Sequence, residues 1–496
     1  MQRKMSADKM AHDIENQLDN LSDLFLERCI YRVPKRLRQV NEKAYTPQVV
    51  SIGPLHHGEE PLKAMEEHKL RYLRHFLSQT GVRLFDYIQK IQDQEERLRG
   101  FYAEPIVFDK DEFVRIVSVD AAFVIDLLLR LHYSNYREED YIFSKPTMIS
   151  DVIRDLKLLE NQLPFFILQD LFKLIPPQLQ LQLPSLLEIS YNFFQSVIDS
   201  EGKKKKFDKI SSSGVEVKHF VDLIRILYLP LEPKKKPETT ATPETTDTPK
   251  TTWCDRMLMR LSHSIFLTSG YTPNTTATPE TTDTPKTTST PETTDPHETT
   301  DKPKTTDPPE TTDKPNITAT PNVTELHQAG AKFKVGKGSS LFDIKFSRGI
   351  LEIPKLRVDD TTDLKLRNIL AFEQCHHREE DYLAYYVFLM KRLAKTPEDV
   401  QLLLEKGIIE NWLGDTQKIS TLLHDLGTGM IVDDWYYAPL CKKLIKYRKQ
   451  PWHEWMVILK QEYFNTPWAS ISVVAAVILL ILTVVQTACS IKSVPL

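Results

Sequence analysis

The feature that most constrains the fold is a Thr- and Pro-rich repeat that interrupts the chain near its middle. Between Lys236 and Thr324 the sequence repeats P-x-T-T-x-T and close variants, and the 14-mer TTATPETTDTPKTT occurs at Thr239–Thr252 and again at Thr275–Thr288. Proline removes backbone donors and β-branched threonine disfavours helix, so we expect an extended, disordered spacer here. Any folded body must therefore be built from the residues on either side of it.

A short segment between the two repeat copies does not share their composition. In Trp253–Tyr271, four apolar residues lie four positions apart, beside Arg256 and Arg260. This spacing places them on one face of a helix. The segment would dock on a membrane surface or a partner, or it is a helix of the body that repeat expansion has separated from the rest.

The C-terminal region is apolar enough to belong to a membrane. From Trp468 to Cys489 the chain reads WASISVVAAVILLILTVVQTAC, without a charge. As a helix rising about 1.5 Å per residue, this stretch is about as long as a bilayer's hydrocarbon core is thick. Trp468 stands at one membrane interface and Lys492 just past the other, as interface anchors do. We therefore predict one transmembrane helix at 468–490 and a single-pass, C-terminal anchor.

The charges on the two sides of this helix predict its orientation. Arg448, Lys449 and Lys460 precede it, whereas Lys492 alone follows it. Basic residues favour the cytosolic side, and the N-terminus shows no secretory signal, so we expect the body to be cytosolic, at the plasma membrane or an endomembrane. In the opposite, lumenal orientation, the repeats would carry glycans and three sequons would be N-glycosylation acceptors, at Asn274, Asn316 and Asn322.

The remaining sequence predicts a mainly α fold. Helical periodicity or apolar density predicts helices at residues 13–32, 61–77, 113–131, 151–175 (divided or kinked at Pro164), 362–375, 382–394, 397–405 and 419–426. Alternating apolar residues around Ser347-Arg348-Gly349 predict one β-hairpin within Leu341–Val358.

Composition excludes several classes of function. The net charge of −4 gives no overall basic field, so nucleic acid is not an expected partner. The five cysteines are scattered without a C-x-x-C pair, which argues against a disulfide framework or a structural zinc site. The basic runs Lys203–Lys206 and Lys234–Lys236 could touch acidic lipid headgroups, although solubilising flanks explain them better.

Phosphate-loop and hydrolase motifs are incomplete. Gly336–Ser340 (GKGSS) lacks the spacing of a phosphate loop, His453-Glu454 lacks the second histidine of a zinc protease helix, and no Gly-x-Ser-x-Gly elbow occurs. The adjacent pair His56-His57 has no set of metal ligands at the right spacing, so loop hydrogen bonding explains it better.

One enzymatic alternative remains open. Adjacent His424 and Asp425 on an apolar helix are similar to the metal-binding pair of His-Asp phosphohydrolases. In such a site a metal would activate a water, with His376 or His377 as a further ligand and Asp433 or Asp434 as the last. The simpler interpretation is the polar face of a helix.

Several ordered segments together resemble a known family. IYRVPKRLRQVNEKAYTPQVVSIGPLHHG, SVDAAFVIDLLL, DLKLLENQLPFFILQDLF, RNILAFEQC and TPEDVQLLLEKGIIENWLG occur in this order, and the match extends from about Cys29 to Gln486. The chain resembles the plant family of domain of unknown function 247, also called uncharacterised protein family 0481. The resemblance implies a plant source and a C-terminal single-span anchor. It supplies no catalytic residue. Some grass members of the family are associated with pollen–stigma self-incompatibility, which makes recognition the leading hypothesis for the function of the family.

These observations predict a domain organisation. It comprises a helical lead-in (1–28), a family domain in two parts (29–236 and 326–467), the disordered insertion (237–325), the membrane helix (468–490) and a short tail (491–496). We expect a membrane-anchored, non-catalytic binding or signalling protein with a lipid bilayer and a protein as partners and no cofactor; the alternative is a metal-dependent hydrolase using His424 and Asp425.

Overall fold

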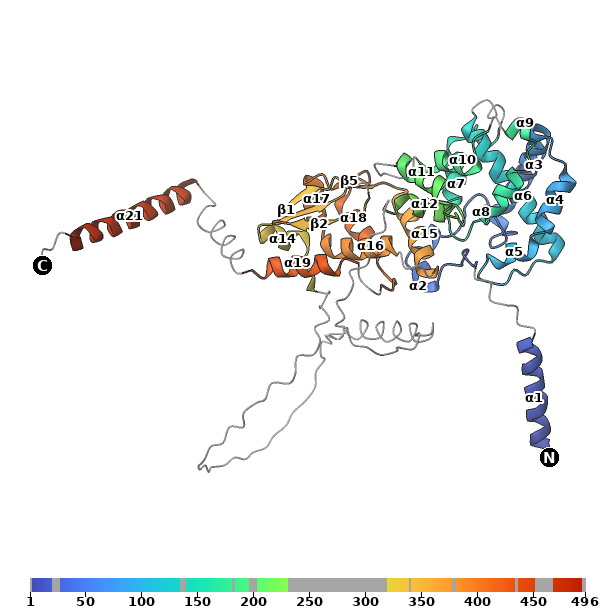
Figure 1. Cartoon of the computed structure of the whole chain (residues 1–496), viewed down its shortest axis with the longest axis horizontal. Helices are drawn as coiled ribbons and strands as arrows, with labels where there is room; N and C mark the ends of the chain where they lie inside the picture. The colour runs from blue at the N-terminus through green and yellow to red at the C-terminus, as the bar shows by residue number, and fades with distance from the viewer. Residues whose placement is uncertain are drawn as a thin grey trace, which may run out of the picture. The chain divides into compact units, whose positions relative to one another are not determined.

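The computed structural model describes the chain on both sides of the repeat insertion. The described residues are 2–19, 27–133, 140–180, 183–195, 203–230, 319–338, 340–376, 381–432, 436–450 and 467–492. Most of the predicted spacer and the whole of Trp253–Tyr271 lie outside these residues. Figure 1 shows the elements in chain order.

Every named element described before the insertion is a helix. Its elements are α1 (Gln2–Asp19), α2 (Lys35–Arg38), η1 (Glu42–Ala44), η2 (Glu60–Met65), α3 (Glu66–Thr80), α4 (Leu84–Gln92), α5 (Glu95–Gly100), α6 (Lys110–His132), α7 (Pro146–Asp155), α8 (Phe165–Phe172), α9 (Pro177–Gln180), α10 (Leu186–Phe194), α11 (Lys203–Ser213) and α12 (Phe220–Tyr228).

The part after the insertion combines helices with two small sheets. Its elements are α14 (Val323–Gln328), β1 (Lys332–Val335), β2 (Lys345–Ser347), β3 (Ile350–Ile353), β4 (Leu356–Val358), α15 (Thr362–Cys375), α16 (Tyr382–Leu393), α17 (Pro397–Glu405), β5 (Ile409–Asn411), α18 (Thr416–Leu426), α19 (Ala438–Arg448) and α21 (Pro467–Lys492).

Helix α6 is the centre of the first part. The Asp109 side chain accepts a hydrogen bond from the Glu112 N–H and so caps the helix, with Asp111 and Glu112 in the first turn favouring its N-terminal dipole. Seventeen of its 23 residues are buried, far more than one stripe could hold. Helices α3, α4, α8 and α10 pack around it (Figure 1). This confirms the core helix predicted over Phe113–Leu131.

The predicted β-hairpin is present and belongs to a larger sheet. Strands β2 and β3 pair antiparallel, with Phe346 opposite Leu351. Their two-residue turn has positive φ at Arg348 (50°) and Gly349 (73°), the pattern of a hairpin turn that follows the twist of the strands. Strand β1, which the sequence pattern did not predict, adds to β3 in parallel, and β4 and β5 form a separate parallel pair.

The two parts of the chain share one core. Their buried apolar residues form a single cluster, and α12 packs against α15. Polar bonds cross the same boundary: the Leu159 N–H donates to Asn368 Oδ1 at 2.8 Å, and Arg225 Nε lies 3.2 Å from Glu373 Oε1. The insertion therefore separates in sequence what is joined in space.

Most predicted helices are confirmed, and two predictions were wrong in their extent. Helices α15 and α17 have the predicted bounds, and the chain is mainly helical. The helix predicted to Arg32 ends at Asp19, and Ile30 instead pairs with Tyr102 in an isolated parallel bridge. The division predicted at Pro164 is confirmed, since α8 begins at Phe165, but the break is a nine-residue loop, 156–164, in which the Asn161 and Gln162 side chains bind backbone groups.

The apolar C-terminal region is helical. It forms α21, Pro467–Lys492, which contains Trp468 and Lys492. Among the residues described, however, no helix fulfils the combined length and apolarity that crossing a membrane requires, so the predicted span at 468–490 finds no support in the structure.

Candidate functional site

The loop between α7 and α8 contains three consecutive polar residues whose side chains are buried. Glu160, Asn161 and Gln162 are each at most 1% exposed, although they stand between apolar residues. Buried polar groups are costly unless hydrogen-bonded, so each must find a partner within the protein. All three do, in different parts of the chain.

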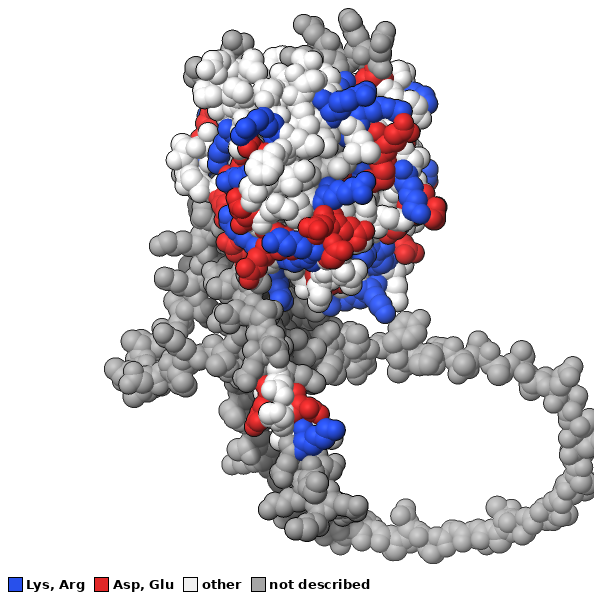
Figure 2. Space-filling model, turned by 90° about the vertical axis from the view of Figure 1, so that its right-hand side faces the viewer, with Lys and Arg blue, Asp and Glu red and all other residues white. Residues whose placement is uncertain are grey.

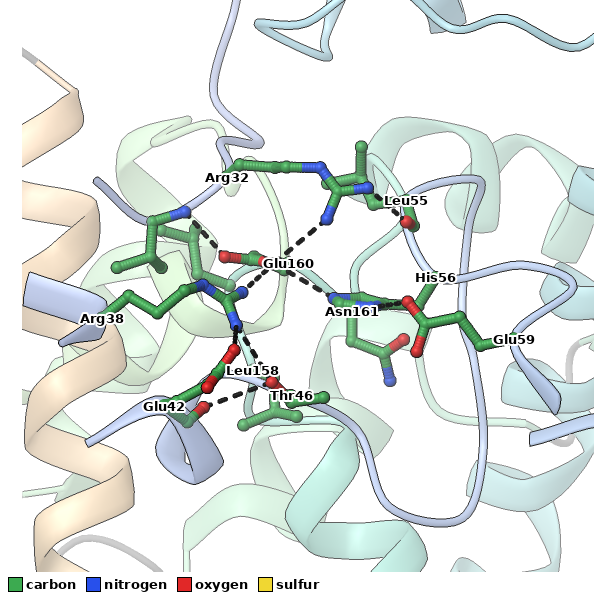
Figure 3. A network of polar contacts seen from close by, with 12 residues as sticks. Arg32, Arg38, Glu42, Thr46, Leu55, His56, Glu59, Leu158, Glu160 and Asn161 are labelled. Atoms are coloured by element: carbon green, nitrogen blue, oxygen red, sulfur yellow. Dashed lines mark hydrogen bonds and ion pairs between the residues drawn. The ribbon is translucent and has the colours of Figure 1, made fainter. Parts of the chain in front are cut away.

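Glu160 binds the segment that begins the folded body (Figure 3). Its Oε1 accepts the Val33 N–H at 2.7 Å, and its Oε2 lies 2.5 Å from Arg38 Nη2 and 3.6 Å from Arg32 Nη1. His56 Nε2 contacts the same Oε2 at 3.1 Å. Burial alone would raise the pKa of this carboxyl, but the bonds from His56, Val33 and Arg38 outweigh it and hold the pKa below its usual value.

The neighbouring amides bind backbone groups. Asn161 Oδ1 accepts the Ile52 N–H at 2.7 Å, and its Nδ2 donates to the Val50 carbonyl at 3.0 Å. Gln162 Oε1 accepts the Phe220 N–H at 3.0 Å, at the start of α12. The Gln162 carbonyl in turn accepts the Tyr102 hydroxyl at 3.1 Å. The two Asn161 bonds hold the loop of residues 48–53, which has no secondary structure of its own.

Two further buried carboxylates hold the same loop. Asp155 Oδ2 accepts the N–H groups of Gln48, Val49 and Val50 at 2.9, 2.7 and 3.1 Å. Asp120 on α6 accepts the Gly53 N–H at 2.8 Å and pairs with the fully buried Lys69 at 2.5 Å. Gly53 has φ +76°, and a Cβ there would lie 2.6 Å from the Gln162 carbonyl oxygen, so the close approach requires glycine.

The chemistry of this network is structural. The Glu160, Asn161, Gln162 and Asp155 side chains bind backbone or side-chain groups of the protein itself, His56 contacts Glu160, and the Arg38 guanidinium offsets the Glu160 charge. These carboxylates, with the Arg38 guanidinium, join residues 33–53 to the end of α7 and the α7–α8 loop. We therefore interpret this cluster as the clamp of the fold and call it the Glu160 clamp.

The clamp also explains the histidine pair. His56 is buried, with Nδ1 at 2.7 Å from Glu59 Oε1 and Nε2 on Glu160, while His57 packs edge-on against Phe108. The prediction that loop hydrogen bonding accounts for the pair is confirmed for His56. Sequence reasoning missed the rest of the clamp, although three consecutive polar residues inside the apolar run LLENQLPFF were a usable signal.

The described residues of the hydrolase alternative do not form a metal site. His424 and Asp425 lie near the end of α18, with side chains 64% and 39% exposed and 3.2 Å between Nδ1 and Oδ1. His376, at the end of α15, has Nδ1 within 3.0 Å of the Tyr31 hydroxyl and the Arg28 carbonyl. In the described part of the chain, no group of three or more potential ligands could hold a metal ion. His377, Asp433 and Asp434 lie outside it.

The other predicted site residues are only partly described. Asn322 is the N-cap of α14, where its side chain accepts the Glu325 N–H at 2.8 Å in a capping box. This helix begins at Val323, two residues before the predicted end of the insertion at 325. Asn274 and Asn316 lie outside the described residues, so glycosylation of the three sequons stays a prediction. The predicted role of Trp468 and Lys492 as membrane-interface anchors also stays a prediction.

The cysteines of the body are buried in part. Cys29 and Cys441 are buried, and burial raises the pKa of the Cys375 thiol to about 12. A thiol with so high a pKa is a poor nucleophile near neutral pH.

Comparison with known proteins identifies the family. The family model of DUF247, described as plant protein of unknown function, matches residues 30–482. The chain belongs to the DUF247 family. Two Arabidopsis thaliana proteins are similar to it over most of their length: UPF0481 protein At3g47200, 27% identical over 94% of this chain and 86% of the relative, and putative UPF0481 protein At3g02645, 23% identical over 98% and 93%. No solved structure matches.

Family membership confirms the resemblance seen in the sequence. Since the matched family is one of unknown function, the molecular function of this chain is unknown as well. The clamp lies inside the matched region and provides the most direct test of how this body is held together.

Replacing Glu160 by Gln should strongly destabilise the body. Gln keeps an acceptor for the Val33 N–H but removes the charge that faces Arg38 and His56, and breaking a buried ion pair costs about 3–5 kcal/mol. Urea denaturation measures this difference in the free energy of unfolding. Glu104→Gln is the matched control, because Glu104 pairs with Arg32 at the surface and should cost less than about 1 kcal/mol. Equal effects of the two substitutions would contradict the clamp.

Lys157, beside the clamp, should weaken the fold at neutral pH. Burial, aided by the ammonium of Lys365, lowers the pKa of Lys157 from 10.5 to about 8. The unfolded chain therefore binds more protons between pH 8 and 10.5, and stability should rise with pH across this window. Lys157→Met removes the cost of burying the charge, so we expect it to stabilise the protein by about 2–3 kcal/mol at pH 7.

Thermal melts at pH 7 and pH 10 test this expectation. The gain from Lys157→Met should shrink at the higher pH, whereas Lys205→Met, at an exposed lysine of α11, should change little at either. A Lys157→Met protein that melts below the wild type at pH 7 would show that the ammonium contributes net stability.

Proposed function

We propose that this protein is attached to a membrane through α21 and acts as a non-catalytic binding protein in signalling or recognition, with its body on the cytosolic side. The observation that carries the membrane attachment is the apolar surface of α21. Six consecutive apolar side chains are 51–67% exposed: Val477, Ile478, Leu479, Leu480, Ile481 and Leu482.

Consecutive residues of a helix are turned by about 100° from one another, so six of them point to all sides. A helix with one apolar stripe can be covered by one protein surface. A helix that is apolar all round is typical of a membrane or of the centre of a large protein. Ile471, Val484 and Val485 are likewise more than half exposed, which extends the apolar surface along the helix. Lipid is the environment that would cover all of it.

Acidic residues placed on α21 should abolish attachment. The α21 variant, Leu479→Asp with Leu480→Asp, brings two carboxylates into the apolar surface, and burying an unpaired carboxylate in an apolar medium is strongly unfavourable. In lysates sedimented at high speed, the wild type should pellet with membranes and resist high salt, whereas the variant should shift to the supernatant by more than about a hundredfold.

The matched control carries the same changes on the body. Leu70→Asp with Leu84→Asp replaces two leucines that are each 45% exposed, on α3 and α4, and should leave the protein in the pellet. Wild-type protein found in the supernatant would overturn the attachment, and a control that also leaves the pellet would show that surface charge alone explains the shift.

The binding role is supported by an exposed tryptophan on the β4–β5 pair. Trp412 is 58% exposed, the Arg357 guanidinium lies 4.0 Å from its ring centroid, and its Nε1 donates to Glu410 Oε1 at 3.0 Å. Glu410 also pairs with Lys355 at 2.6 Å. A rigid indole beside arginine is the composition that dominates binding energy in protein interfaces. We propose that this surface contacts the protein partner.

Trp412→Ala should therefore weaken partner binding while leaving the fold intact. An anchor of this kind contributes at least about 2 kcal/mol to binding, so the partner's affinity should fall more than about tenfold. A partner first recovered by cross-linking at the membrane can be titrated against each variant. Phe85→Ala is the control, because Phe85 is 73% exposed on α4 and should not matter. Unchanged affinity for Trp412→Ala would exclude this surface.

A further inference from the structure

Basic residues are concentrated at one end of the body. Residues 332–357 contain seven Lys or Arg and two Asp or Glu, and residues 436–450 contain five Lys or Arg and no acid, in a chain whose net charge is −4. The first segment forms the sheet β1–β3–β2, and the second contains α19.

The fold brings these two segments together. Helix α19 packs against β2, with the Tyr447 ring edge-on to Phe346 at 5.1 Å. A Cβ at Gly349, in the hairpin turn, would lie 2.9 Å from the Tyr447 hydroxyl, so the turn and the helix are in direct contact. In Figure 1 the sheet and α19 lie at the end of the body away from α3 and α4.

The cations of this region point to solvent. In β1, Lys332 and Lys334 are exposed on either side of the buried Phe333, because side chains alternate along a strand. In α19, Cys441 and Leu444 are buried and the basic residues are exposed. We call this set the basic end; its members are Lys332, Lys334, Lys337, Lys345, Arg348, Lys442, Lys443, Lys446, Arg448 and Lys449.

Among the described residues, few of these charges are neutralised by ion pairs. In the described chain two members of the basic end form ion pairs, Lys345 with Asp343 at 2.8 Å and Arg448 with Glu325 at 3.3 Å. The sheet register places Glu352 between Lys334 and Lys345, so one carboxylate faces two ammonium groups. The end thus keeps a large positive field that an anionic partner would relieve.

The opposite end of the body differs in its charge pattern. The face shown in Figure 2, at the end formed by α3 and α4, mixes Lys and Arg with Asp and Glu. Paired contacts such as Arg71 with Glu67 and Arg83 with Asp86 account for part of this mixture. The excess of positive charge is therefore a local property and not one of the whole surface.

We infer that the basic end binds the acidic headgroups of the membrane to which α21 attaches the protein. This inference rests on the proposed attachment. Helix α19 ends at Arg448 and α21 begins at Pro467, and chain of this length reaches at most about 65 Å. The basic end is thus confined near the lipid surface, where each basic residue close to an anionic leaflet adds about a factor of five in affinity. The cytosolic leaflet is the anionic one.

Vesicles of two compositions test this inference with the full-length chain. Phosphatidylcholine vesicles, with or without about one third phosphatidylserine, are floated with the α21 variant (Leu479→Asp, Leu480→Asp), so that the basic end acts alone. We expect binding to the anionic vesicles only, and release at high salt because the interaction is screened. Adding Lys442→Gln, Lys443→Gln and Lys446→Gln should weaken this binding by about a hundredfold.

The matched control removes the same number of charges elsewhere. Lys110→Gln, Lys204→Gln and Lys205→Gln alter exposed lysines of α6 and α11 and should leave binding unchanged. The inference would be overturned if the α21 variant bound both vesicle types equally. It would also be overturned if this control weakened binding as much as the substitutions at Lys442, Lys443 and Lys446. Tighter binding of a short duplex DNA than of the anionic vesicles would overturn it too, in favour of nucleic acid.

The wild-type chain separates this inference from the proposed attachment. If α21 attaches the protein, the wild type should also float with pure phosphatidylcholine. Wild type that binds anionic vesicles alone would refute attachment through α21 and still support the basic end. Wild type that floats with both types, together with an α21 variant that binds neither, would support α21 and refute the basic end.

Discussion

The body depends on buried carboxylates that have no access to water. Glu160 and Asp155 sit in an apolar interior where an ionised group is tolerated only if donors surround it. The donors here are backbone N–H groups of residues 33 and 48–50, together with Arg38 and His56. Irregular backbone at residue 33, before α2, and at residues 48–50, after η1, is thereby fixed against the end of α7 and the α7–α8 loop.

This arrangement explains what the sequence could and could not predict. Helices such as Pro397–Glu405 carry local signals: Thr396 and Asp399 form a capping box and proline follows the cap, so their bounds were predicted correctly. The Glu160 clamp has no local signal of that kind, because the Val33 N–H that Glu160 accepts lies 127 residues away in sequence. Around residues 151–175 the sequence predicted a division at Pro164, which is confirmed, but the length of the loop before Pro164 depends on tertiary hydrogen bonds that have no local signal.

The same distinction applies to the candidate sites. The His424-Asp425 pair matched a motif by sequence alone, but the structure leaves it at the surface of α18 without a third ligand among the described residues. The basic end, in contrast, matched no motif in the sequence and becomes visible only in the fold. Its lysines come from two distant segments, neither of which stands out as a continuous basic run, and the packing of α19 on β2 joins them. Surface electrostatics of this kind require the fold before they can be recognised.

The bonds that cross the insertion have a consequence for synthesis. Arg225 is buried against Glu373, which follows it by 148 residues. At about 5–20 residues per second, a ribosome needs roughly 7–30 s to make the interval between them. During that time the N-terminal part has an interior cation and an apolar face uncovered. Expansion of the Thr/Pro repeat lengthens this wait, so repeat number would set how long each nascent chain relies on chaperones.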